Sequence, residues 1–290
     1  MKAYKFIYIL FFVCFYGCIK EVSIDFDYKK KIVVLSNIST YNQTNQFILT
    51  NNIPPSEGPM GMENYYITDA TILLKDEFGN EQQINYSPFF NKAYTVDSND
   101  FKFIEGRKYF LTITTGDGGE VSASMKMPMG VNPKKYYCDT SAVAYLDTLN
   151  NTMKRHVDLS MDFERGNDYY LAAAQVYSTC RYLNSHGNNN IDSKVSYFNF
   201  PDGDGPLNMD TVVSDYVSDT ISTFSISIDS VAYFVNAIDP VFQKYKSTVS
   251  KQLAAYQDPF AQPILIYSNI QNGLGVFNGN TVRSKKIKFK

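Results

Sequence analysis

Short segments of β-branched and aromatic residues, separated by turn-forming residues, recur through the first half of this chain. The clearest pair is residues 109–115 and 121–127, which flank a Gly-Asp-Gly-Gly sequence at 116–119. Glycine adopts positive φ angles without a Cβ clash, so this spacing predicts a tight β-hairpin. Similar segments lie at residues 32–35, 47–50, 70–74, 82–86 and 93–96. Roughly seven short strands at such spacing predict an immunoglobulin-like or prealbumin-like β-sandwich over residues 30–129.

The second half of the chain, residues 130–290, has longer β patterns and one helical pattern. Residues 156–163 alternate polar and apolar side chains, which is typical of a half-buried strand. Apolar residues then recur every three to four positions near residues 240–257, behind Pro240, which suits a first helical position. The sequence therefore predicts a second β-rich domain that carries one amphipathic helix.

The last part of the chain is expected to be β as well. Residues 264–270 and 275–277 are mostly apolar and flank an Asn-Gly turn, so strands are expected on both sides of it. Residues 283–290 place basic side chains among apolar ones. Lysine on an exposed strand discourages pairing with other chains, so this stretch is expected to be a final edge strand.

The N-terminus resembles a bacterial lipoprotein signal. Lys2 and Lys5 precede an apolar run at residues 6–16, and Gly17 then precedes Cys18. A run of about eleven residues suits a signal peptide and is too short to cross a bilayer, which needs roughly 20. We expect residues 1–17 to be removed, Cys18 to carry the lipid and residues 18–29 to form a tether. An ordinary secretory signal or a buried N-terminal strand is the alternative.

Charge and cysteine content limit the classes of partner. The chain has 27 Lys and Arg against 29 Asp and Glu, whereas a nucleic-acid partner requires a clustered basic face. We therefore expect no nucleic-acid partner. With Cys14 in the signal and Cys18 assigned to the lipid, Cys138 and Cys180 remain. These two could form a disulfide in an oxidising envelope compartment, but no spacing rule decides whether they pair or stay free.

No motif in the sequence predicts catalysis, so we expect a protein that is not an enzyme and has no cofactor. His156 and His186 are the only histidines, and no nucleophile elbow, phosphate-binding loop or dinucleotide motif is present. Asp202, Asp204 and Asp210 are spaced so that their carboxylates could hold Ca²⁺. The full calcium-loop motif and its distal Glu are missing, so a Gly/Asp turn without metal is the preferred interpretation.

Two further patterns suggest surface chemistry. Tripeptides in which Asp is followed by Ser or Thr and then by an apolar residue could be O-glycosylated, although such tripeptides are common by chance. Their hydroxyl residues are Thr148, Thr211, Thr220 and Ser230. Tyrosine pairs at 65–66, 136–137 and 169–170 could offer flat contacts to sugars or peptides. Adjacent strand residues point to opposite faces, so one tyrosine of each pair is expected in the core.

Several motifs, taken in order, resemble a known family. They are Asp-Ala-Thr-Ile at 69–72, Gly-Arg-Lys-Tyr-Phe-Leu at 106–111, Gly-Asp-Gly-Gly-Glu-Val-Ser-Ala at 116–123 and Asn-Ile-Gln-Asn-Gly-Leu-Gly-Val-Phe at 269–277. Together with the lipid-site cysteine and the short tether that precede them, these motifs resemble the Bacteroidota outer-membrane lipoprotein family called domain of unknown function 4249. The resemblance covers nearly the whole mature chain, and the ending at 269–277 is its most specific part.

The resemblance implies a location and partners. Members resemble outer-membrane lipoproteins that accompany TonB-dependent transporters, so we expect an accessory protein for nutrient capture or uptake, with a peptide or glycan ligand. Whether it lies on the periplasmic face or the cell surface is left open. No catalytic residues are established for the family, so none are carried over. The alternative is a structural or adhesive cell-surface β-sandwich protein without a role in uptake. A hydrolase is the least favoured class.

Overall fold

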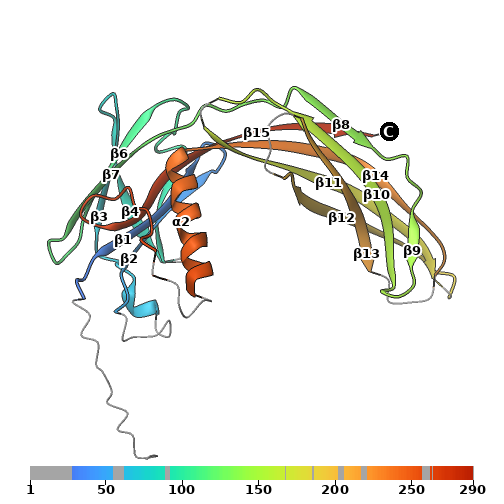
Figure 1. Ribbon diagram of the computed structural model, residues 1–290, viewed down its shortest axis with the longest axis horizontal. Helices are drawn as coiled ribbons and strands as arrows, with labels where there is room; N and C mark the ends of the chain where they lie inside the picture. The colour runs from blue at the N-terminus through green and yellow to red at the C-terminus, as the bar shows by residue number, and fades with distance from the viewer. Residues whose placement is uncertain are drawn as a thin grey trace, which may run out of the picture.

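The structure is a computed structural model, and the part of the chain that it describes is mainly β. It describes residues 28–54, 62–88, 92–166, 168–184, 186–201, 206–216, 221–256, 262 and 264–289. The expected signal peptide, Cys18, Asp202, Asp204 and Thr220 lie outside these residues. Two β-rich parts form an arch, which Figure 1 shows from the front. No helix among the described residues is long and apolar enough to cross a membrane.

The first part of the arch is a β-sandwich, as the sequence predicts. Its elements are β1 (Ile32–Ser39), β2 (Thr44–Asn51), the 3-10 helix η1 (Met62–Tyr65), β3 (Thr71–Asp76), β4 (Glu81–Ser87), β5 (Ala93–Asp97), β6 (Lys108–Thr114) and β7 (Glu120–Lys126). Alternate side chains point inward and form one hydrophobic core, in which Phe47, Leu74 and Tyr109 are fully buried. The predicted hairpin is β6–β7, and Gly118 in its turn has a φ of 85°.

The second part is also built from two facing sheets. Its strands are β8 (Lys135–Asp139), β9 (Tyr145–Asp147), β10 (Thr152–Asp162), β11 (Tyr169–Asn184), β12 (Asn189–Asn199), β13 (Leu207–Tyr216), β14 (Ile221–Ile238) and β15 (Leu274–Lys288). One sheet has the order β12-β11-β14-β15, and the other has β13-β10-β8, with β9 beside β10. A second core, which includes Val157, Val176 and Tyr233, fills the space between them. The prediction of a mainly β fold is therefore confirmed.

Strand β15 belongs to both parts of the arch. It pairs in parallel with β1 from Val33↔Leu274 to Ser39↔Asn280. It then pairs antiparallel with β14 from Ile238↔Asn280 to Ser230↔Lys288, so its partner changes at Asn280 (Figure 1). Beyond Asn280, no strand of the described residues pairs with its other side, and the basic stretch lies at a sheet edge as expected.

The two cores do not divide the chain as the sequence analysis expected. Ile270 and Phe277, which were assigned to the second domain, lie in the first core. The reason is the parallel pairing of β15 with β1, which brings the end of the chain back to the first sandwich. Such long-range pairing leaves no local sequence signal.

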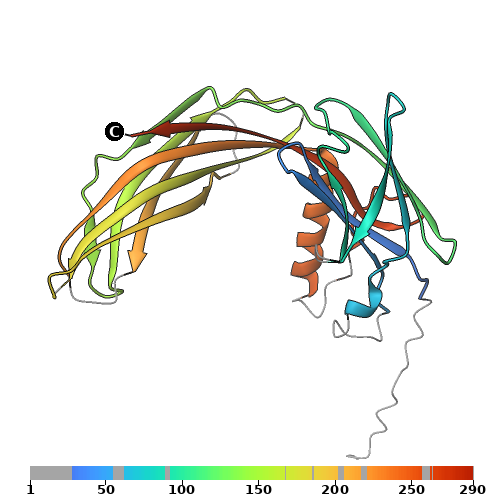
Figure 2. The same ribbon diagram turned by 180° about the vertical axis from the view of Figure 1, so that it is seen from behind.

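The predicted strand at residues 264–270 was wrong, whereas the predicted helix is present. Helix α2 (Pro240–Tyr256) lies on the inner side of the arch beside the first sandwich, as Figure 2 shows from behind. Residues 264–270 run without strand pairing. The N–H groups of Ile264 and Tyr267 instead donate to side chains of α2, at 2.5 Å to Gln252 Oε1 and 2.9 Å to Thr248 Oγ1.

Candidate functional site

Cys138 and Cys180 are free thiols in the structure, although both face the second core. Burial raises the pKa of the Cys138 thiol to about 11 and that of Cys180 to about 12. Both groups are therefore protonated and weakly nucleophilic at neutral pH. These cysteines contribute to packing and give no sign of a redox site.

Of the predicted modification and metal residues, the structure describes Thr148, Thr211, Ser230 and Asp210. Thr148 is exposed in the turn after β9, and Thr211 is half-buried in β13. Ser230 is buried in β14, and a glycan there stays a prediction. Asp210 lies on β13 with its Oδ1 3.2 Å from Nδ1 of His156. No group of three metal-ligating side chains occurs among the residues that the structure describes.

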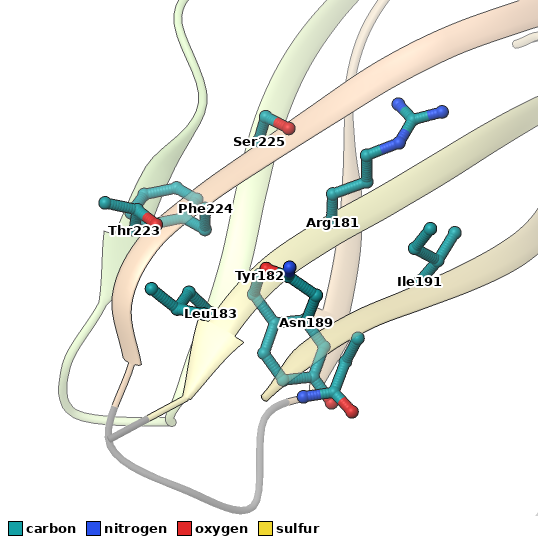
Figure 3. Close-up of a pocket in the computed structure, with 9 residues that line it drawn as sticks. Arg181, Tyr182, Leu183, Asn189, Ile191, Thr223, Phe224 and Ser225 are labelled. Carbon is teal, nitrogen blue, oxygen red and sulfur yellow. The ribbon is translucent and has the colours of Figure 1, made fainter. Parts of the chain in front are cut away.

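A pocket of about 420 Å³ lies near the far end of the second part. Arg181 of β11, Ile191 of β12 and Ser225 of β14 line it, so it crosses three neighbouring strands (Figure 3). The Arg181 side chain is exposed, and Ile191 is 64% exposed. An exposed guanidinium beside an apolar side chain is a weak site by itself, because water competes for every polar group.

A larger groove of about 550 Å³ lies between α2 and the outer face of the first sandwich. Its floor comes from β1, β2 and β15, and its wall comes from Phe242 and Tyr245 of α2. Residue Asp239 fixes where the helix begins. Its Oδ1 accepts the N–H of Val241 at 2.9 Å, and its own N–H donates to the Gly279 carbonyl at 3.0 Å. The start of α2 is therefore fixed to β15, and this keeps the helix beside the floor of the groove.

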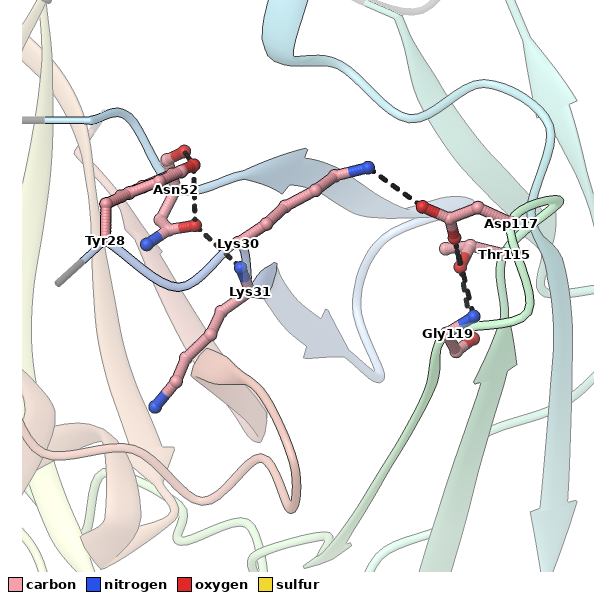
Figure 4. A network of polar contacts seen from close by, with 7 residues as sticks. All are labelled: Tyr28, Lys30, Lys31, Asn52, Thr115, Asp117 and Gly119. Carbon is pink, nitrogen blue, oxygen red and sulfur yellow. Dashed lines mark hydrogen bonds and ion pairs between the residues drawn. The ribbon is translucent and has the colours of Figure 1, made fainter.

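A polar network fixes the place where the described chain enters the first sandwich (Figure 4). Tyr28 Oη donates to the Asn52 carbonyl at 2.6 Å, and Asn52 Oδ1 accepts the Lys31 N–H at 2.7 Å. Lys30 Nζ lies 2.8 Å from Asp117 Oδ2 in the β6–β7 turn. The hydrogen bond from Lys30 holds the pKa of Asp117 well below its ordinary value. The end of the expected tether at Tyr28, and Lys30 and Lys31 that follow it, are thus attached to the sandwich.

Comparison with family models identifies the family. The model described as "Domain of unknown function (DUF4249)" matches residues 19–286. The chain belongs to this family. A comparison with curated proteins found no match. Among solved structures, a chain described with the chaperone–tip adhesin complex of CFA/I fimbriae is 12% identical, with 68% of this chain and 83% of that chain covered. Its TM-score of 0.12 supports no inference about fold or function.

The DUF4249 match spans both sandwiches and most of β15. The groove below α2 in this DUF4249 protein was missed by the sequence analysis. Its lining comes from three segments far apart in the chain, residues 35–48, 242–245 and 276–278, so no spacing rule could join them. One signal in the sequence of β15 was available, because Val276, Asn278 and Asn280 alternate with Phe277 and with small residues. This part of the strand is buried on both faces, yet one face carries amides. Buried amides on one face of a strand indicate a polar site.

Proposed function

We propose that this protein is a lipid-anchored accessory protein of the outer membrane that assists a TonB-dependent transporter in nutrient capture or uptake. The sequence before the described residues supports the anchor, because Cys18 follows a signal-like run. Membership of the DUF4249 family agrees with the resemblance from which we inferred the transporter. Bacteroidota origin belongs to the same proposal.

The observation that carries the proposal is the shape of the arch. The first described residues, the end of α2 and the β9–β10 turn all lie on its open side (Figures 1 and 2). Tyr28 is tied to the first sandwich, so a tether from Cys18 would leave on that side. The open side, with the groove beside α2, would then face the membrane and any barrel within it. Leu149, in the β9–β10 turn, is 94% exposed and is available for such a contact.

Lipidation is tested with labelled palmitate. We expect the native chain to incorporate the label and Cys18→Ala to lose it. Cys14→Ala is the matched control, because it removes a cysteine from the signal and leaves the lipid site intact. Label retained in the Cys18→Ala protein would defeat the anchor.

The transporter role is tested by purification of the native protein from its own membranes under mild detergent. We expect a TonB-dependent barrel to co-purify in near-equal amount. Leu149→Asp, which places a charge on the open side of the arch, should reduce the yield of barrel. If no barrel co-purifies with the native chain, the structural or adhesive role replaces the uptake role.

A further inference from the structure

We infer that the groove below α2 binds a neutral sugar. This names the ligand class for the proposed capture role and so rests on that proposal. The groove volume of about 550 Å³ is within the usual range for small-molecule sites, about 300–1,000 Å³. The argument for a neutral sugar comes from charge, from one unpaired buried atom and from the aromatic wall.

No charged side chain lines the groove among the described residues. The lining consists of amide, hydroxyl, aliphatic and aromatic groups, including Asn37, Gln46 and Asn278. An ionic ligand would lose its hydration here without gaining an opposite charge, which is unfavourable. The groove therefore selects a neutral ligand with many hydrogen-bonding groups.

Asn278 provides the most specific observation. Its side chain is fully buried, and its Nδ2 donates to Asn37 Oδ1 at 2.8 Å. Its Oδ1 has no hydrogen-bond partner among the residues that the structure describes. A buried polar atom without a partner costs free energy, so native proteins rarely leave one unpaired. Asn278 lines the groove, so a small shift of its buried amide toward a bound ligand would let a ligand hydroxyl donate to this oxygen.

Asn37 offers the complementary group. Its Oδ1 already accepts from Asn278 Nδ2 at 2.8 Å and from Asn280 Nδ2 at 2.7 Å. Its own Nδ2 is thereby left to donate, and the Asn37 residue is exposed at the groove. A hydroxyl group both donates and accepts, so neighbouring sugar hydroxyls can satisfy Asn278 and Asn37 together.

The aromatic wall suits the apolar face of a sugar ring. The rings of Phe242 and Tyr245 lie 6.5 Å apart between centroids with an angle of 29° between their planes. No side chain of α2 that the structure describes is buried, so these two rings are only partly covered by protein. An extended peptide is disfavoured, because β1 on the floor is already paired with β2 and β15 and has no free edge there.

The test is calorimetric titration of the purified full-length protein. The probes are glucose, galactose, mannose, N-acetylglucosamine and the linear trisaccharide of each, with galacturonic acid and trialanine as charged and peptide comparators. We expect at least one neutral sugar to bind. Asn37→Ala and Phe242→Ala should each weaken that binding at least tenfold. Gln243 is exposed on the same turn of α2 as Phe242, so the control Gln243→Ala should change the affinity by less than twofold.

Because Asn278 is buried, its test is Asn278→Asp, which keeps the side-chain shape and places a charge in the neutral groove. Circular dichroism confirms the fold, and the sugar affinity should fall at least tenfold. The inference is overturned if no neutral sugar binds, if galacturonic acid or trialanine binds more tightly, or if Asn37→Ala and Phe242→Ala leave binding unchanged. Co-purification of the barrel is measured independently, so failure of sugar binding does not imply failure of the transporter role.

Discussion

The side chain of Asn269 holds the backbone of Phe277 through two hydrogen bonds. Nδ2 donates to the Phe277 carbonyl at 2.7 Å, and Oδ1 accepts the Phe277 N–H at 3.0 Å. Phe277 is fully buried, and its ring centroid lies 6.2 Å from that of Phe47. The first and last residues of the family-like ending at 269–277 are therefore one structural unit, which directs β15 into the first core.

Asn269→Ala should destabilise the protein by about 1–3 kcal/mol, because two backbone groups of a buried residue lose their partner. Urea denaturation measures the change in the free energy of unfolding. Asn99→Ala is the control, since Asn99 is exposed in a turn and its replacement should change stability by less than about 0.5 kcal/mol. Equal stability of the two variants would contradict this role for Asn269.

Gly275→Ala should destabilise β15 more than the same change in an open turn. Gly275 has a φ of +104°, and an added Cβ would lie 2.0 Å from the Val34 carbonyl oxygen. Gly118 has a φ of +85° with nothing within 4 Å of such a Cβ, so Gly118→Ala measures the backbone strain alone. By urea denaturation, we expect the free energy of unfolding to fall by about 1–2 kcal/mol for Gly118→Ala and by clearly more for Gly275→Ala. Similar values for both would show that β1 moves away at little cost.

Asp76 should make the first sandwich sensitive to acid. Its side chain is 2% exposed, and its Oδ2 lies 2.7 Å from Arg107 Nη1. Burial raises the pKa of Asp76, but hydrogen bonds from Asn80, Phe78 and Arg107 outweigh burial and hold the pKa below the ordinary value of 3.8. A carboxylate with a lowered pKa in the folded state stabilises the protein above its unfolded pKa, and this stabilisation is lost as pH falls through the folded pKa.

Thermal unfolding from pH 7 to pH 2 tests this prediction. Asp76→Asn should be less stable at pH 7, and its midpoint should fall less steeply than that of the native chain below about pH 4. Asp100→Asn, at an exposed turn residue, should follow the native curve. If Asp76→Asn kept the native acid slope, the loss of stability would have to come from other carboxylates.

The two thiols of the second sandwich should be unreactive until the protein unfolds. Burial raises the pKa of Cys138 to about 11 and of Cys180 to about 12, so little thiolate is present at pH 8. Without reductant, iodoacetamide should leave both residues unmodified in native protein and alkylate both in guanidinium. Mass spectrometry of their separate peptides provides the measurement. Peptides linked to each other after unfolding would instead establish a disulfide.

Local features of the fold were predictable, whereas long-range features were not. The β6–β7 hairpin follows from glycines within its own turn, and α2 follows from its spacing and Pro240. Strand β12 was not predicted, because most of its residues are exposed on both faces and no alternation is visible. Residues 264–270 look like a strand, but the N–H groups of Ile264 and Tyr267 bond to side chains of α2.

The groove could not be predicted for a related reason. Asn37 and Asn278 are 241 positions apart, and only the parallel register of β1 and β15 places their amides in contact. The sequence contains amide and aromatic residues along its whole length. It could not show which of them would meet on one face of a strand.

The change of pairing partner along β15 affects how the protein folds while it is being synthesised. β15 is the last strand of the described chain, so the ribosome releases every other strand before it. During that interval β1 has an unpaired edge beside β2, which is a template for pairing with other chains. The amino-terminal half therefore cannot complete its fold as it emerges.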